Sequence, residues 1–179
     1  MDQRIFRRGR GVRPGMRLDR TMLLLPPAFG VHVAEEAGGF TEWVQRHGRR
    51  DYSRADFVQI NASGLLLTLL ATAAVRRWPG RRLFAAYYGV IVTQQALFNP
   101  AFHVGSGVAT RDWSPGTATA VVLFLPLWWR VTRAALRAGV LTRRAMAAGI
   151  ALGGVVHAAA VADQVFGVAP VTSRARSRG

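Results

Sequence analysis

The chain has 179 residues, half of them hydrophobic, and carries a formal net charge of +15. Its 24 basic residues are all arginines that lie in blocks between apolar stretches, which argues against a nucleic-acid-binding protein with one basic face. The absence of cysteine excludes disulfides, cysteine metal ligands and a thiol nucleophile. Any metal ion would have to be held by His, Asp, Glu or Asn side chains.

Residues 1–20 contain seven arginines and predict a basic cytoplasmic tail ahead of the first apolar stretch. That stretch begins at Met22, and its purely apolar part ends at Ala34. Such a helix would be about 20 Å long, shorter than the roughly 30 Å hydrocarbon core of a bilayer. We therefore predict that the helix continues to Val44. The alternative is that it ends early, so that the glutamates at its end face outer water.

Four more apolar stretches follow, each bounded by arginine, proline or glycine. They cover approximately residues 57–75, 83–104, 114–129 and 145–169. The five stretches predict an all-α fold, a polytopic transmembrane bundle of about five helices surrounded by the lipid bilayer. The bundle is predicted to be one domain over residues 21–169, followed by a short basic tail at residues 170–179.

The arginine blocks also predict how the bundle is oriented. With the N-terminus inside, the inner segments carry sixteen arginines and the outer segments carry eight. The positive-inside rule then favours a multi-pass protein of the cell membrane with a cytoplasmic N-terminus and an external C-terminus. A cleaved signal peptide at the first stretch is an alternative, but Pro26 and Pro27 interrupt its apolar part.

The first predicted span contains three ionisable side chains. His32, Glu35 and Glu36 are spaced i, i+3 and i+4, so they project from one helix face, near the middle of a helix that runs from Met22 to Val44. Ionisable groups at that depth are costly unless they are paired, hydrated or bound to a metal ion. The stretch is therefore the first candidate for a functional site.

Other spans place polar side chains at a similar depth. Asn99 and His103 share a face of the third span, where Pro100 between them predicts a local kink. His157 lies near the middle of the fifth span. With the predicted orientation, these groups lie in the middle or the outer half of the membrane, as expected for a polar cavity open to the outer face.

Imidazole nitrogens and carboxylate oxygens suit a divalent metal ion such as Zn, Fe or Mn. The predicted ligands are His32, Glu36, His103 and His157. Whichever of Glu35 and Glu36 is not a ligand is the predicted acid/base group for a metal-bound water, and Asn99 is predicted to orient a ligand or polarise the substrate. For His157 the alternative is an interhelical hydrogen bond without a role in metal binding.

Three motifs resemble those of the HXXEE family, a group of small bacterial integral membrane proteins. They are HVAEE at residues 32–36, FNPAFH at residues 98–103 and PGTATAVVLFLP at residues 115–126. The resemblance covers the chain from about residue 20 to 165 and places weight on His32, Glu35, Glu36, Asn99 and His103, with His157 compatible. It implies a membrane protein and supplies no substrate.

The leading functional hypothesis is a metal-dependent hydrolase that acts on a lipid or another membrane-embedded substrate. A proton-coupled transporter is the alternative, in which the glutamates and histidines relay protons. A non-catalytic accessory membrane protein is the third possibility, with the polar groups serving only helix packing. The substrate, the metal and the oligomeric state do not follow from the sequence.

Overall fold

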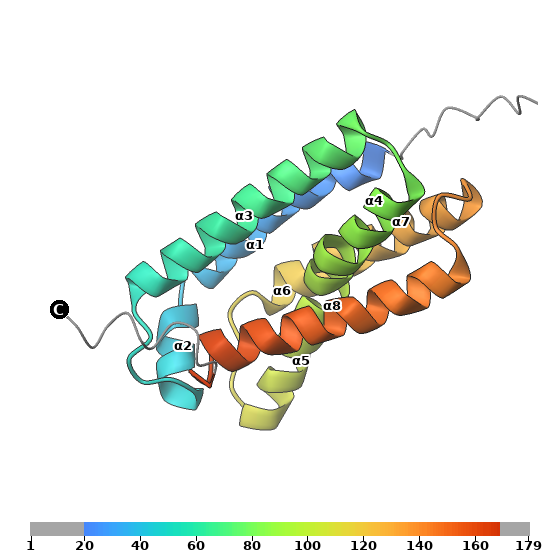
Figure 1. Cartoon of the computed structure of the whole chain (residues 1–179). Coiled ribbons are helices and arrows are strands. Elements are labelled where there is room, and N and C mark those ends of the chain that lie inside the picture. The colour runs from blue at the N-terminus through green and yellow to red at the C-terminus, as the bar shows by residue number, and fades with distance from the viewer. Residues whose placement is uncertain (1–19, 169–179) are drawn as a thin grey trace, which may run out of the picture.

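The computed structural model describes residues 20–168, and all regular secondary structure in this range is helical, as predicted for an all-α fold. The helices form an elongated bundle (Figure 1). The two predicted tails lie outside the described residues, apart from Arg20.

The first helix is shorter than predicted. A 3₁₀ turn, η1 (Arg20–Leu24), leads into α1 (Leu25–Glu36), and a separate helix, α2 (Phe40–His47), follows after a turn. The predicted continuous helix to Val44 is therefore wrong. The turn contains the pair Gly38-Gly39, and two consecutive glycines disfavour a helix because of their large conformational entropy.

The end of α1 also changes the position of the motif. His32 and Glu36 lie in the last turns of α1 and not in the middle of a span. Together, η1 and α1 are about 28 Å long, close to the roughly 30 Å hydrocarbon core of a bilayer. The prediction that the motif lies at the middle of the helix is thus incorrect, and the helix ends early as in the alternative. His32 and Glu36 are nevertheless buried, so Glu36 does not face outer water.

The remaining chain forms four long helical stretches. α3 (Arg54–Arg77) begins at a capping box between Ser53 and Asp56, and α8 (Arg143–Gln164) begins at Thr142, whose side chain caps the backbone N–H of Ala145. Two composite helices lie between them. The first consists of α4 (Arg81–Tyr87), η2 (Tyr88–Phe98) and α5 (Asn99–Thr110), and the second of α6 (Thr117–Thr119), η3 (Ala120–Phe124) and α7 (Leu125–Arg137).

Each composite helix contains a π-helical stretch just before a proline. η2 ends two residues before Pro100, and η3 ends two residues before Pro126. Proline lacks a backbone N–H and its ring collides with the carbonyl of the preceding turn, and a wider π turn relieves this collision. The local distortion expected at Pro100 is therefore present as a π stretch.

Three of the described helices are long and apolar enough to cross a membrane, namely Arg54–Arg77, Thr117–Arg137 and Arg143–Gln164. This is consistent with a membrane protein. The predicted number of about five spans is not confirmed, since α1 is short and the composite helix that ends with α5 carries polar residues such as Gln94, Gln95 and Asn99.

The bundle packs closely where α8 crosses η2. A Cβ atom on Gly153 would lie 1.9 Å from Thr93 Oγ1, so only glycine allows this approach. The Thr93 hydroxyl donates to the carbonyl oxygens of Gly89 and Gly149, at 2.8 and 2.9 Å. Small residues and a bridging hydroxyl thus join the two helices, as is typical of membrane helix pairs.

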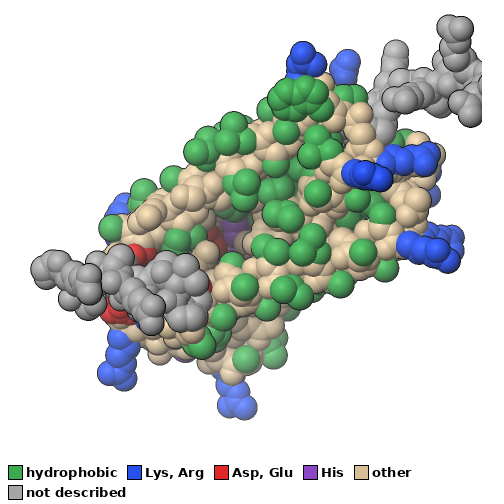
Figure 2. Space-filling view, in the orientation of Figure 1, with side chains coloured by type: hydrophobic (Ala, Val, Ile, Leu, Met, Phe, Trp, Pro, Cys, Tyr) green, Lys and Arg blue, Asp and Glu red, His purple; other side chains and the backbone are tan. Residues whose placement is uncertain are grey.

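Two apolar clusters divide the interior. The larger one lies towards the connections α3–α4 and α7–α8 and includes Phe84, Tyr88 and Phe124. At this end Figure 2 shows a group of basic side chains. The smaller cluster packs α2 and the loop after it against α3 and α8, and its members are Phe40, Trp43, Val44, Tyr52, Phe57 and Val165.

Residues 40–53 therefore form a cap over one end of the bundle. Asp112, in the loop after α5, accepts hydrogen bonds from Arg46 at 2.9 Å and from His47 at 2.8 Å. These bonds from His47 and Arg46 hold the pKa of the Asp112 carboxyl below its usual range. The candidate site lies directly beneath this cap.

Candidate metal centre

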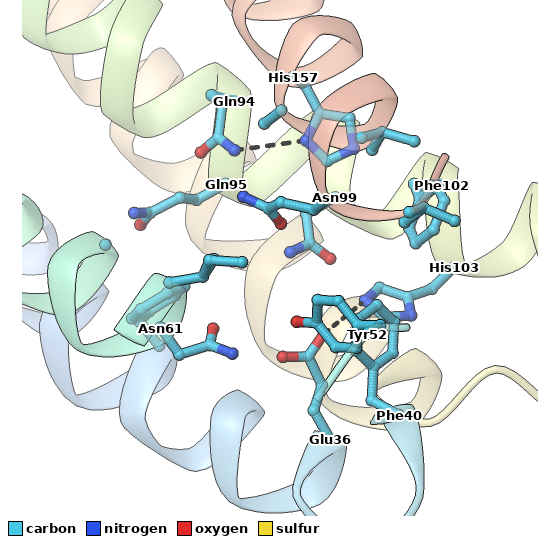
Figure 3. A pocket seen from close by; sticks show the side chains of 17 residues that line it. Glu36, Phe40, Tyr52, Asn61, Gln94, Gln95, Asn99, Phe102, His103 and His157 are labelled. Atoms are coloured by element: carbon cyan, nitrogen blue, oxygen red, sulfur yellow. Dashed lines mark hydrogen bonds and ion pairs between the residues drawn. The ribbon is translucent and has the colours of Figure 1, made fainter. Parts of the chain in front are cut away.

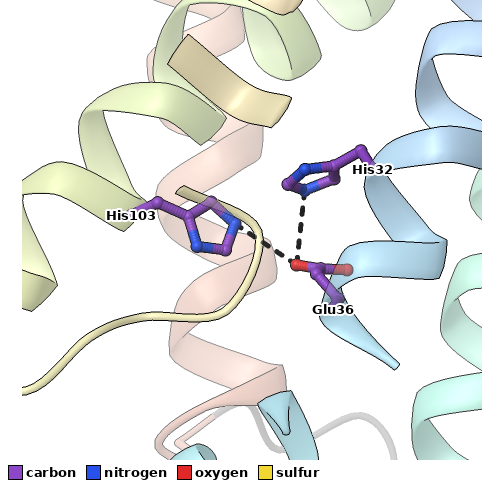
Figure 4. A group of neighbouring side chains, drawn as sticks. All are labelled: His32, Glu36 and His103. Carbon is purple, nitrogen blue, oxygen red and sulfur yellow. Dashed lines mark ion pairs between the residues drawn. The ribbon is translucent and has the colours of Figure 1, made fainter. Parts of the chain in front are cut away.

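His32, Glu36 and His103 converge in the interior of the bundle (Figure 4). His32 and Glu36 are one turn apart on α1, and His103 comes from the middle of α5. Glu36 Oε1 lies 3.3 Å from His32 Nε2 and 3.2 Å from His103 Nε2. Both histidines are 1% exposed and Glu36 is 6% exposed, so bulk water does not compete for these atoms.

The far side of the His32 ring is held by a hydroxyl. His32 Nδ1 lies 2.9 Å from Thr119 Oγ1, and that hydroxyl donates to Glu35 Oε2 at 2.5 Å. Because the carboxylate takes the hydroxyl hydrogen, His32 Nδ1 is the donor to Thr119. Nε2 of a neutral His32 then carries a lone pair directed towards Glu36 and His103.

Glu35 points away from His32 Nε2 and Glu36, although it is adjacent in sequence. Its carboxylate accepts from the backbone N–H of Ala118 at 3.2 Å and of Thr119 at 2.8 Å, as well as from the Thr119 hydroxyl. These are free N–H groups in the first turn of a long helix, where negative charge is favoured. Glu35 thus joins α1 to α6 and orients His32 through Thr119. His32 and Glu35 share a helix face, as predicted, because both contact the Thr119 hydroxyl.

His103 is held in a similar way by the loop before α6. His103 Nδ1 lies 2.9 Å from Ser114 Oγ, which leaves Nε2 facing Glu36. Gly116 in the same loop has a φ of +101°, and a Cβ atom there would lie within 3.0 Å of His32, His103 and Glu36. The loop can therefore close over the three side chains only if residue 116 is glycine.

The arrangement fits a divalent metal ion. One nitrogen from each histidine and one Glu36 oxygen lie within 4.8 Å of one another. Within the described part of the chain, His32 Nε2 has no hydrogen-bond partner despite its 3.3 Å distance to Glu36 Oε1, as expected for a nitrogen that is aimed at a point between the three atoms. Two imidazoles and one carboxylate form a donor set used by catalytic zinc and non-haem iron sites. His32, Glu36 and His103 are the residues that would hold the ion.

The hydrogen bonds from Glu35 through Thr119 to His32 predict that Glu35 affects metal affinity, although it is not a ligand. Glu35→Gln should weaken the binding of zinc by about 10- to 100-fold, because the orienting partner of a histidine ligand is usually worth that much. Zinc affinity measured by competition with a chelator tests this expectation. Glu42→Gln, at an exposed position of α2, is the matched control and should leave the affinity unchanged. Equal affinities in the two variants would contradict an orienting role for Glu35.

A cavity of about 130 Å³ adjoins two of the three side chains, Glu36 and His103. Glu36 and His103 form part of its wall, and the other labelled side chains in Figure 3 surround the same space. Its further polar lining residues are Asn61, Gln94, Gln95, Asn99, His157 and Gln164. Tyr52 and Phe40 from the cap close one side.

His157 does not belong to the group of three, although it was among the four predicted ligands. It lies elsewhere on the wall of the cavity, and its Nδ1 is 3.3 Å from Gln94 Nε2. Asn99 also lines the cavity. Among the described residues, His157 Nε2 and Asn99 Oδ1 are buried without a hydrogen-bond partner. The structure thus brings three predicted ligands together and places His157 and Asn99 where they would meet a bound molecule.

Sequence analysis did not identify Tyr52, Ser114 or Gly116 as site residues. Tyr52 is 1% exposed and lines the cavity, and burial together with the nearby Glu36 carboxylate raises its pKa. It lies in a charged loop without periodicity, so no local signal points to it. For Gly116 a signal exists, because the Pro115-Gly116 pair predicts a turn.

The comparisons with known proteins agree with the sequence motifs. The family model described as a protein of unknown function with HXXEE motif matches residues 23–131, more than half of the chain. This segment contains His32, Glu36 and His103. No curated protein matches the chain, and no solved structure matches it.

Proposed function

The chain belongs to the HXXEE family, and from this premise we propose that it is a membrane-embedded, metal-dependent hydrolase acting on a lipid or another membrane-embedded substrate. The observation that carries the proposal is the convergence of His32, Glu36 and His103 next to a polar cavity. If these polar side chains served only helix packing, they would be expected to form separate hydrogen-bonded pairs at several helix interfaces. Their convergence therefore makes a non-catalytic accessory protein the weaker alternative.

Each residue has a distinct task in this proposal. A bound divalent ion supplies Lewis acidity to a water molecule and to a carbonyl oxygen. His32 and His103 hold the ion through Nε2, and Glu36 holds it through Oε1. The other oxygen of Glu36 accepts the proton of the attacking water.

Tyr52 acts on the leaving-group side. Its hydroxyl and the Glu36 carboxylate face the same space in Figure 3. A tyrosine hydroxyl is protonated at neutral pH, so Tyr52 donates a hydrogen bond to an oxygen that gains negative charge. Asn99 contacts the substrate from the opposite wall.

Glu36→Gln tests this function in a lipid ester hydrolysis assay with the zinc-loaded protein. We expect the rate to fall by at least about 100-fold, since the variant loses both a charged ligand and the proton acceptor. Glu42→Gln, exposed on α2, is the control and should keep the full rate. Rates that do not depend on zinc, or that survive in Glu36→Gln, would exclude a metal-dependent hydrolase.

The proposal places the bundle across the cell membrane in several passes, with a cytoplasmic N-terminus and the metal centre near the outer face. The arginines at the α3–α4 and α7–α8 connections would be cytoplasmic. The opposite end carries the cap and three aspartates, Asp51, Asp56 and Asp112. Residue 169 and the tail after it are proposed to lie outside.

The lack of cysteine makes this orientation directly testable. Asp51→Cys lies beside the cap and Arg82→Cys lies at the opposite end, and both positions are exposed. A membrane-impermeant maleimide should label Asp51→Cys in intact cells and Arg82→Cys only after the membrane is permeabilised. The reversed pattern would show a periplasmic or extracellular N-terminus.

The transporter alternative has less support. A carrier needs a path from the polar cavity to the other side of the membrane, at least in alternation. Between the cavity and the arginine-rich end lies the larger apolar cluster, with Phe84, Tyr88 and Phe124 fully buried. The polar groups therefore form a site at one end of the bundle, without a polar path to the arginine-rich end.

A further inference from the structure

The chemistry of the cavity wall restricts the molecules that it can hold. The chain has no lysine, and no arginine is among the described residues that line the cavity. An anionic headgroup would therefore find no cationic side chain on this wall, so that only the metal ion could balance its charge.

Carboxamides dominate the polar part of the wall. Asn61, Gln94, Gln95, Asn99 and Gln164 each offer a donor and an acceptor. Within the described residues, Gln95 Oε1 and Asn99 Oδ1 have no partner, and Gln95 is only 4% exposed. A hydroxyl group is the natural complement of such a surface, because it donates and accepts through one atom.

His157 adds a further unpaired polar atom. Its Nδ1 faces Gln94, and its Nε2 is buried and lacks a partner in the part of the chain that the structure describes. Buried polar atoms of this kind normally have a partner. The three unpaired atoms belong to side chains that line the cavity, which points to a polar molecule as its occupant.

The cavity opens between α3 and α8. Asn61 and Gly64 on α3, and His157 and Ala160 on α8, line its two sides and are only half-buried. Figure 2 shows a histidine side chain at the bottom of a hollow between these helices. The apolar lining residues Ile60 on α3 and Val161 on α8 are also half-buried. A hydrocarbon chain would thus lie between the helices while its headgroup enters the cavity.

We propose that the cavity binds the glycerol headgroup of a neutral, hydroxylated lipid of the monoacylglycerol type, with its acyl chain between α3 and α8. The cavity volume of about 130 Å³ leaves room for a small polyhydroxylated headgroup. The hydrolysis step of this inference rests on the proposed function. The inference adds the class of substrate that the same site would cleave.

In that step, a water oxygen bonds to the ester carbonyl carbon of the lipid and its proton passes to Glu36. The bond between the acyl carbon and the glycerol oxygen then breaks. The glycerol oxygen takes up the proton held by Glu36, so that water and ester give a fatty acid and glycerol and Glu36 returns to its starting state. The glycerol hydroxyls pair with the carboxamides of Asn99 and Gln95 and with His157.

Binding can be tested separately from hydrolysis with 1-O-hexadecylglycerol, an ether that cannot be cleaved. Its affinity for the purified zinc-loaded protein would be measured in detergent by displacement of a fluorescent analogue. We expect Asn99→Leu and His157→Leu each to weaken binding by about 10-fold, as for the loss of a buried hydrogen bond. Thr110→Val, at the far end of the same helix as Asn99, should bind like the unmodified protein.

Competition by anionic and zwitterionic lipids tests whether the cavity prefers a neutral headgroup. Ether analogues of phosphatidic acid and phosphatidylcholine should compete at least about 10-fold less well than the ether glycerol. Equal competition by either one, or unchanged binding in both leucine variants that remain folded, would overturn the inference. Tight binding of the ether with no zinc-dependent cleavage of the matching ester would support the binding site and refute the hydrolase function.

Discussion

His103→Ala is expected to abolish stoichiometric zinc binding while the helical bundle stays folded. The variant removes one of three ligand atoms and leaves His32 and Glu36 adjacent on α1. Loss of an orienting partner alone typically costs 10- to 100-fold in affinity, so loss of a ligand should cost more than about 100-fold. Metal content of the purified protein by mass spectrometry, together with helix content by circular dichroism, measures both parts of the expectation.

His47→Ala provides the matched control for His103→Ala. His47 is also a histidine with a carboxylate partner, but that partner is Asp112 in the cap and not Glu36. This variant should keep one zinc ion per chain. Zinc retained in His103→Ala, or lost equally in His47→Ala, would show that the described triad does not hold the metal.

Gly116→Ala is expected to cause the second large effect, a loss of both stability and metal affinity. The positive φ of residue 116 costs a non-glycine residue about 1–2 kcal/mol. The added Cβ atom would lie 2.7 Å from His32 Cε1 and 2.8 Å from His103 Cε1, and such overpacking costs about 1–3 kcal/mol more. Together these terms predict a destabilisation of about 2–5 kcal/mol, measurable as a lower unfolding temperature, with weaker zinc binding because the two rings must separate.

Gly105→Ala separates this effect from a general sensitivity to alanine. Gly105 lies in α5, two residues after His103, and a Cβ atom there would meet nothing within 4 Å. Alanine is the better helix former, so this variant should be as stable as the unmodified protein or slightly more stable. If Gly116→Ala were equally well tolerated, the loop would not be packed over the metal centre as described.

A buried glutamate between two histidines also explains why the centre should bind metal more weakly at low pH. Imidazole must be neutral and the carboxylate ionised to act as ligands, so protons and metal compete for the same atoms. The site is thus suited to one cation at a time, either protons or a metal ion.

The sequence predicted the long helices well because their signal is local. The second stretch, residues 57–75, lies within α3, and the fifth, from residue 145 onward, follows the start of α8 closely. Length and hydrophobicity alone identify such helices. The first stretch failed for the opposite reason. The decision between one helix and two depended on the pair Gly38-Gly39 and on the packing of Phe40 and Trp43 into the cap, and the second factor is not local.

For the candidate site, too, the local features could be predicted and the features that depend on tertiary packing could not. The i, i+4 spacing of His32 and Glu36 put both on one face of a helix whatever the rest of the chain did, and the lack of cysteine restricted the metal ligands to oxygen and nitrogen donors. Which distant histidine joins them is a matter of tertiary packing. His103 faces Glu36 because the loop with Ser114 and Gly116 closes over both, and His157 instead pairs with Gln94.

Glu35 shows most clearly the difference between local and tertiary information. Its sequence position predicted a helix face shared with His32, and both side chains contact Thr119. Its role could not be predicted, because the first turn of the helix that begins at Thr117 lies beside it and donates N–H groups to its carboxylate. The sequence by itself determined which chemical groups the protein has at this level, because composition and helical periodicity are local. Only the tertiary structure decided which of them bind, orient or face the cavity, because those roles depend on neighbours more than 60 residues away.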